Sequence, residues 1–132
     1  GLSFPGPGEV SAKGDARLIW TGRDQAFLQG VALPEGIEGH VAVTDQSDAW
    51  ASVRVSGEAA VAALSRLVAL DLRPAAFPVG RVVRSAVTHM NAILLRTEAG
   101  IEVWVFRSMA RTLWHELTEV LDHLDARAAA KV

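Results

Sequence analysis

The most constraining feature of the sequence is a succession of three apolar runs that are separated only by very short breaks. The runs cover about residues 81–88, 92–97 and 101–107. The first break holds His89, Met90 and Asn91, and the second is the turn sequence TEAG. Apolar runs bounded by turn residues are typical of strands, and breaks this short require neighbouring strands to run antiparallel. The sequence therefore predicts an antiparallel sheet with a hairpin tip at residues 89–91.

The other periodic segments add strands and two helices. Short strands are expected over residues 16–22, 25–30, 40–45 and 49–57. Helices are expected over 56–70 and 108–129, with Ser56 and Ser108 as N-caps. This order favours an α+β fold, an antiparallel sheet with the two main helices packed on one face. The expected buried stripes are Val61, Leu64, Leu67 and Val68, then Met109, Leu113, Leu117, Val120, Leu121 and Leu124.

The composition predicts one globular domain. Residues 1–15 are rich in Gly, Pro and Ser and are expected to form a flexible lead-in, followed by a single domain over residues 16–128. Cysteine is absent, which excludes disulfides and a thiol nucleophile. No secretory signal is recognised, and no apolar run approaches the ~20 residues that a membrane span requires. We therefore expect a cytoplasmic protein without a membrane partner.

The charge distribution argues against nucleic acid as a partner. Residues 52–111 carry eight arginines against four acidic residues, but the whole chain has a net charge of −2 and a pI of about 6.1. Nucleic-acid binding requires clustered positive charge, and no Lys/Arg cluster interleaved with aromatic residues occurs. Arginine is also favoured at protein interfaces, and this interpretation fits the sequence better.

The run IEVWVFR is apolar on both faces of its predicted strand. Ile101, Val103 and Val105 alternate with Trp104 and Phe106, whereas a sheet with helices on one side should alternate apolar and polar residues. Either the N-terminal strands cover the second face, which is the simpler explanation for any single residue, or a partner subunit or second copy covers it. The candidate partner interface on this face consists of Trp50, Arg54, Trp104 and Phe106.

The sequence assigns no catalytic, cofactor-binding or metal-binding residue. His115, Glu119 and His123 have i, i+4, i+8 spacing, but a solvated helix face explains them better than a metal site, because eight residues drift about 80° around a helix. The stretch DQSD, Asp45 to Asp48, is expected to be a turn in which a side chain bonds the local backbone. No GxSxG, GxGxxG or phosphate-binding loop occurs.

Two groups of residues, in order and with natural spacing, carry a family resemblance. They are Asp45, Ser47, 55–57, 70–72, Pro74, Phe77, Pro78 and Gly80, followed by Arg107, Ser108, Ala110, Leu113 and Trp114. Together with the stretch LIWTGRDQAFLQG, these residues resemble the gamma subunit of heterotetrameric sarcosine oxidase. The resemblance covers about residues 16–125.

This resemblance implies a fold and a function. The fold would be that of the folate-binding aminomethyltransferases, which include the glycine-cleavage T-protein. The chain would be a non-catalytic accessory subunit of a flavin-dependent complex that oxidises sarcosine, and the other subunits would be its partners. That complex is expected to use FAD, FMN, NAD and tetrahydrofolate on those other subunits, with none on this chain.

The resemblance also offers an interpretation of the polar hairpin tip. In the aminomethyltransferase relatives the corresponding hairpin is longer and carries an acidic side chain that assists one-carbon transfer to folate. Here the run from Val82 to Arg96 contains no Asp or Glu, so the tip is interpreted as a lost site. Two alternatives stay open: a free-standing folate-binding module or aminomethyltransferase-like protein, and a homo-oligomeric protein that only shares the fold.

Overall fold

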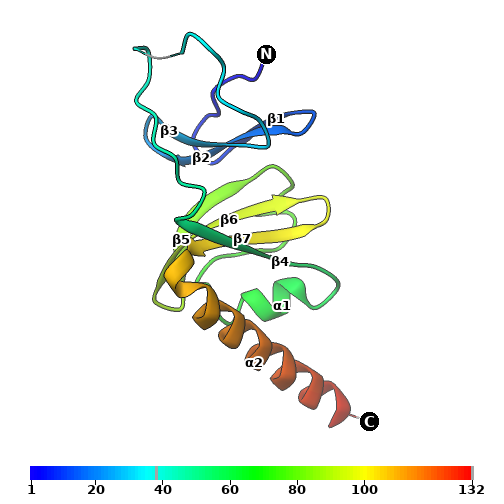
Figure 1. Cartoon of the computed structure of the whole chain (residues 1–132). Coiled ribbons are helices and arrows are strands. Elements are labelled where there is room, and N and C mark those ends of the chain that lie inside the picture. Colours follow the sequence, from blue (N-terminus) through cyan, green and yellow to red (C-terminus); the bar gives the residue numbers. More distant parts are fainter. Residues whose placement is uncertain (38, 132) are drawn as a thin grey trace.

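The chain folds into three layers, which are a small sheet, a larger sheet and a pair of helices (Figure 1). This computed structural model describes residues 1–37 and 39–131. The larger sheet lies in the middle, so that one of its faces meets the helices and the other meets the small sheet (Figure 1). The predicted α+β class is therefore confirmed.

The small sheet consists of β1 (Val10–Lys13), β2 (Ala16–Gly22) and β3 (Gln25–Gln29), in the order β1-β2-β3. β1 lies within the predicted flexible lead-in, residues 1–15. It pairs along its whole length with β2, and the carbonyl of Gly8 just before it accepts a 2.8 Å hydrogen bond from the amide of Val82. The lead-in prediction is therefore wrong for residues 10–13, because backbone pairing holds a segment with little apolar content in the sheet.

The larger sheet is antiparallel throughout and has the order β4-β7-β6-β5. Its strands are β4 (Trp50–Val55), β5 (Val82–Val87), β6 (Met90–Thr97) and β7 (Gly100–Phe106). Val87 pairs with Met90, so Thr88 and His89 alone form the turn between β5 and β6. The three predicted strands and their antiparallel pairing are confirmed, but Met90 and Asn91 belong to β6 rather than to the tip.

The helices α1 (Ala60–Leu64) and α2 (Ala110–Ala129) pack on one face of the larger sheet, and a short 3-10 turn, η1 (Arg107–Met109), leads into α2. Their contact with the sheet forms the main core, in which Leu64, Leu94, Val103 and Leu113 are fully buried. Burial of one such side chain contributes roughly 1.5–3 kcal/mol. None of the helices within the described residues is long and apolar enough to cross a membrane.

Both helices differ in detail from the prediction. The first is shorter than residues 56–70, since regular helix begins only after Gly57, whose φ is +89°, and irregular turns carry the buried Leu67 and Val68. Neither Ser56 nor Ser108 is the N-cap; Ala59 and Met109 hold those positions without a side-chain hydrogen bond. In α2 the buried stripe is narrower than predicted, and Met109 and Leu121 are exposed.

The predicted strand over residues 40–45 does not form. These residues lie in the long connection between β3 and β4, where Val41 and Val43 are each about half exposed. Their alternating pattern has no buried face to satisfy, since all six residues are exposed. An alternating pattern without a surface to pack against does not hold a strand in place.

Candidate functional site

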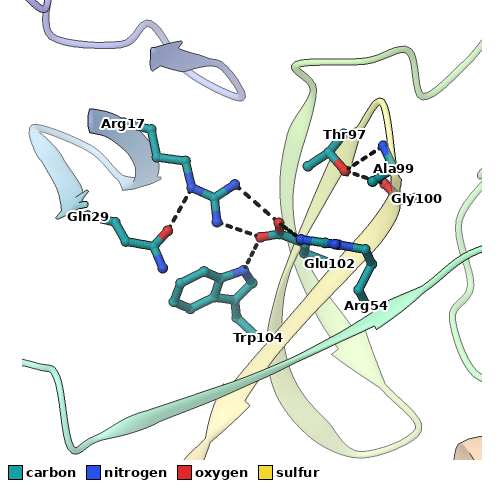
Figure 2. Close-up of polar contacts among 8 residues, drawn as sticks. All are labelled: Arg17, Gln29, Arg54, Thr97, Ala99, Gly100, Glu102 and Trp104. Carbon is teal, nitrogen blue, oxygen red and sulfur yellow. Dashed lines mark hydrogen bonds and ion pairs between the residues drawn. The ribbon is translucent and has the colours of Figure 1, made fainter. Parts of the chain in front are cut away.

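A buried carboxylate lies between the two sheets, at Glu102 in the middle of β7 (Figure 2). Arg17 of β2 donates two hydrogen bonds to it, from Nη1 to Oε1 at 3.2 Å and from Nη2 to Oε2 at 2.8 Å. Trp104 Nε1 donates a third, to Oε2 at 3.1 Å. Arg17 Nε donates in turn to Gln29 Oε1 of β3 at 2.6 Å. We call Arg17, Gln29, Glu102 and Trp104 the inter-sheet cluster.

The charges of the inter-sheet cluster suit a structural role. Arg54 of β4 adds a second guanidinium, with its Nη2 3.7 Å from Glu102 Oε1, and Arg17 also lies 5.9 Å from the centre of the Trp104 ring. Both oxygens of Glu102 therefore face donors or positive charge. A carboxylate whose two oxygens are held by partners within the chain is not turned toward a substrate. The inter-sheet cluster therefore connects the small sheet to the larger one.

An aromatic row extends from the inter-sheet cluster to the end of β7. Phe27 of β3 lies between two tryptophans, with ring centres 5.4 Å from Trp50 and 6.5 Å from Trp104, and Trp50 lies 4.6 Å from Phe106. The small sheet thus covers much of this face, as the intrachain explanation expects. Phe106 is 43% exposed at the end of the row.

The four residues of the candidate partner interface consequently differ in their surroundings. Trp50 and Trp104 pack in the apolar cluster between the sheets and are only partly exposed. Arg54 and Phe106 are exposed, with 55% of the Arg54 side chain accessible. A contact of these residues with a partner protein stays a prediction, and Arg54 and Phe106 are the two that such a partner could reach directly.

The β5–β6 hairpin does not assemble a catalytic group. His89 is exposed in the two-residue turn, whereas Met90 is only 2% exposed and packs in the main core. Asn91 points its amide oxygen at Arg84 Nη2, 3.4 Å away, and Arg84 also donates to the carbonyl of Thr21 at 3.0 Å. The polar groups next to the tip therefore serve as a second connection between the sheets.

The remaining sequence candidates are separate surface features. Ser47 donates from its amide and its hydroxyl to Asp45 Oδ1, which confirms the predicted turn and lowers the pKa of Asp45. His115 and Glu119 lie 3.9 Å apart on the exposed side of α2. Within residues 1–37 and 39–131, no three His, Cys, Asp or Glu side chains gather as a metal site would require.

Two shallow hollows lie on the surface away from the inter-sheet cluster. One, of about 240 Å³, is lined by Phe4, Pro5, Pro7, Trp20, Arg23 and Asp24. The other, of about 190 Å³, lies beside Asp71, whose pKa is lowered to about 2 chiefly by the side-chain hydrogen bond from Arg73. Neither hollow includes a residue of the inter-sheet cluster.

The sequence interpretation missed Glu102. A signal was present, since Glu102 is the one charged residue within Gly100–Phe106 and lies on the same face as Trp104, two positions away. Its partner Arg17 is 85 residues distant in the chain, and no periodicity relates the two positions. Only the packing of the two sheets brings them together.

Comparisons with known proteins agree with this architecture. The family model described as the GCVT N-terminal domain matches residues 18–130. No curated protein matches the chain. Among solved structures, a chain of heterotetrameric sarcosine oxidase from Corynebacterium sp. U-96, in complex with pyrrole 2-carboxylate, superposes with a TM-score of 0.78 at 24% identity. The match covers 88% of this chain but only 65% of that one.

These matches confirm the aminomethyltransferase-like fold and, at the level of the fold, the resemblance to a sarcosine oxidase chain. The family match spans both sheets from β2 onward and both helices. The chain therefore belongs to the GCVT N-terminal domain family.

Proposed function

We propose that this chain is a non-catalytic accessory subunit of a flavin-dependent sarcosine oxidase complex in the cytoplasm. The observation that carries the proposal is its likeness in fold to a chain of heterotetrameric sarcosine oxidase, over 88% of its length. In this proposal FAD, FMN, NAD and tetrahydrofolate are held by other subunits. The contribution of this chain is to complete and stabilise the assembly.

The polar groups of the chain support a role without its own cofactor. Among the described residues, every buried side-chain nitrogen or oxygen has a hydrogen-bond partner within the chain. A cofactor site usually places a few polar groups at a well-formed pocket, where they bind the ligand rather than one another. The most buried carboxylate, that of Glu102, is held by Arg17 and Trp104 rather than turned toward a cavity.

The β5–β6 hairpin supports the same conclusion. One-carbon transfer needs a group that moves a proton at the reacting nitrogen, and such a group must reach the substrate. Between Val82 and Arg96 the chain has no Asp or Glu, and the turn consists only of Thr88 and His89. This favours the accessory role over a free-standing aminomethyltransferase.

Purification of the chain from its native source under mild conditions tests the proposal. We expect it to travel with larger, flavin-containing subunits, in a yellow fraction that oxidises sarcosine. The pure chain should neither oxidise sarcosine nor bind tetrahydrofolate at micromolar concentration. Recovery of the native chain free of flavoprotein, together with micromolar folate binding, would instead establish the folate-binding alternative.

The exposed end of the aromatic row is our proposed contact with a partner subunit. Aromatic and arginine side chains commonly anchor interfaces. Arg54 lies on the edge strand β4, and Phe106 ends the neighbouring strand β7 opposite Trp50 of β4. Phe106→Asp should leave the chain folded and reduce its recovery with the flavoprotein. Val79→Asp is the matched control, because Val79 is 53% exposed and lies shortly before β5, the strand at the opposite edge of the larger sheet. Equal recovery of both variants would refute this contact.

A further inference from the structure

Helix α2 carries an exposed strip that its packing against the sheet does not explain. Trp114 is 61% exposed and Leu121, which the apolar stripe predicts as buried, is 36% exposed. With Arg111, Thr118 and Asp125 they form a 3-4-3-4 spacing along one side of the helix. Such a spacing keeps side chains on a single narrow seam, as in helices that pair along their length. We call these five residues the α2 strip.

The α2 strip lies well away from the buried side of the helix. Leu113, Leu117 and Val120 face the core, and at 100° per residue the strip is turned about 100° from them. Figure 1 shows the C-terminal half of α2 extending past α1 and the edge of the sheet. A long, partly apolar seam is thus accessible to another helix.

The α2 strip is complementary to itself when it is reversed. Arg111 and Asp125 lie at equal distances on either side of Thr118, and Trp114 and Leu121 are centred within half a residue of the same point. Within residues 1–37 and 39–131, neither Arg111 nor Asp125 has an ion-pair partner. The two unmatched charges therefore have opposite signs and symmetric positions.

The centre of the α2 strip also suits close approach. The hydroxyl of Thr118 donates back to the carbonyls of Trp114 and His115, at 2.9 and 3.0 Å. Its polar group is thereby satisfied within the helix, and a small side chain marks the midpoint. A small residue at a crossing point lets two helices come near each other.

We propose that α2 pairs antiparallel with α2 of a second copy of this chain, about a two-fold axis near Thr118. Arg111 of each copy then faces Asp125 of the other, and each Trp114 packs against the other copy's Leu121. A two-fold interface repeats every contact twice. A parallel pair is disfavoured, because it would place arginine against arginine and aspartate against aspartate. The inference does not depend on the proposed function.

Sedimentation velocity of the full chain at protein concentrations from about 1 µM to about 1 mM measures the association. This range covers the dissociation constants expected of a small interface. We expect a reversible dimer. Trp114→Ala should weaken it by at least about 30-fold, as is usual for a central tryptophan. A chain that stays monomeric up to about 1 mM, or a dimer indifferent to Trp114→Ala, would overturn the proposal.

A charge exchange tests the orientation. Arg111→Glu and Asp125→Arg should each weaken the dimer by about tenfold, because each change acts at two symmetric pairs. The double variant should recover association to within about threefold of the original. Arg127→Glu, on a different side of α2, is the matched control and should have no effect. A double variant as weak as either single variant would contradict antiparallel self-pairing.

One further outcome separates this inference from the proposed function. If the isolated chain is monomeric but Trp114→Ala abolishes its recovery with the flavoprotein, a partner subunit covers the α2 strip. The self-pairing would then be wrong while the accessory role stands. Conversely, a dimer with the expected charge exchange and no flavoprotein partner would support the self-pairing and refute the accessory role.

Discussion

Removal of Arg17 tests most directly how the small sheet is held. Arg17→Met keeps most of the side-chain length but deletes both hydrogen bonds to Glu102, whose side chain is 7% exposed. Removal of one partner from a buried ion pair costs ~3–5 kcal/mol, because the other charge stays buried. Here Trp104 Nε1 and the more distant Arg54 still face the carboxylate. We therefore expect a loss at the lower end, about 3 kcal/mol.

The paired replacement should cost much less than the single one. Replacement of both charges by apolar residues is often nearly neutral, since it also removes the desolvation cost. Arg17→Met combined with Glu102→Leu should therefore lie within about 1 kcal/mol of the original protein. Urea unfolding followed by tryptophan fluorescence measures these free energies, and three of the four tryptophans, Trp20, Trp50 and Trp104, pack between the sheets.

Two results would refute this reasoning. A cost below about 1 kcal/mol for Arg17→Met would mean that the pair is screened like a surface salt bridge. A double variant that loses the sum of the two single losses would mean that the two residues act independently. Either result would remove the inter-sheet cluster as the fastening between the sheets.

Three further predictions concern the turns and the surface. Asp71→Asn should lower stability above about pH 4, and the difference should vanish below about pH 2, because the folded pKa of about 2 lies below the ordinary value of 3.8 and the stabilisation is lost as pH falls through this range; acid titration followed by circular dichroism measures this. Gly30→Ala should destabilise strongly, since Gly30 has φ +88° and its Cβ would lie 1.8 Å from the carbonyl oxygen of Asp15; unchanged thermal melting would contradict it. Met90→Ala should cost ~2–5 kcal/mol whereas His89→Ala should stay within about 0.5 kcal/mol, and chemical denaturation of both variants checks this difference between core and turn.

The sequence predicts the larger sheet well because the apolar pattern of each strand indicates which of its faces are buried. Ile101, Val103 and Val105 face the helices and Trp104 the small sheet, as their alternation indicates. The short connections between these strands then allow only antiparallel pairing of neighbouring strands. Residues 40–45 show the same alternating pattern but pack against no buried surface, and there the strand prediction is wrong.

Features that depend on distant partners could not be predicted in this way. β1 is held by backbone pairing with β2, and the hydrogen bond from Val82 of β5 to Gly8 fixes the chain just before it. The side chains of β1 indicate neither contact. Met90 looks like part of a polar tip, yet the two-residue turn before it places its side chain in the core. In the candidate site, the pairing of Arg17 with Glu102 follows only from the stacking of the two sheets.

The three-layer arrangement also sets an order for folding. The hairpins β5–β6 and β6–β7 join neighbours in sequence, whereas the small sheet finds most of its cover on β5, β6 and β7, with separations of 63 residues between Thr21 and Arg84 and 85 between Arg17 and Glu102. Contacts so distant in sequence form slowly, because the chain loses the entropy of closing a long loop before the favourable contact energy is gained. During synthesis, Ile19 leaves the ribosome long before Ile93 exists to cover it, and Phe27 leaves before both Trp50 and Trp104. The small sheet is therefore synthesised before the strands that cover it and completed after them, and it is the part of this fold that most needs protection from aggregation in the nascent chain.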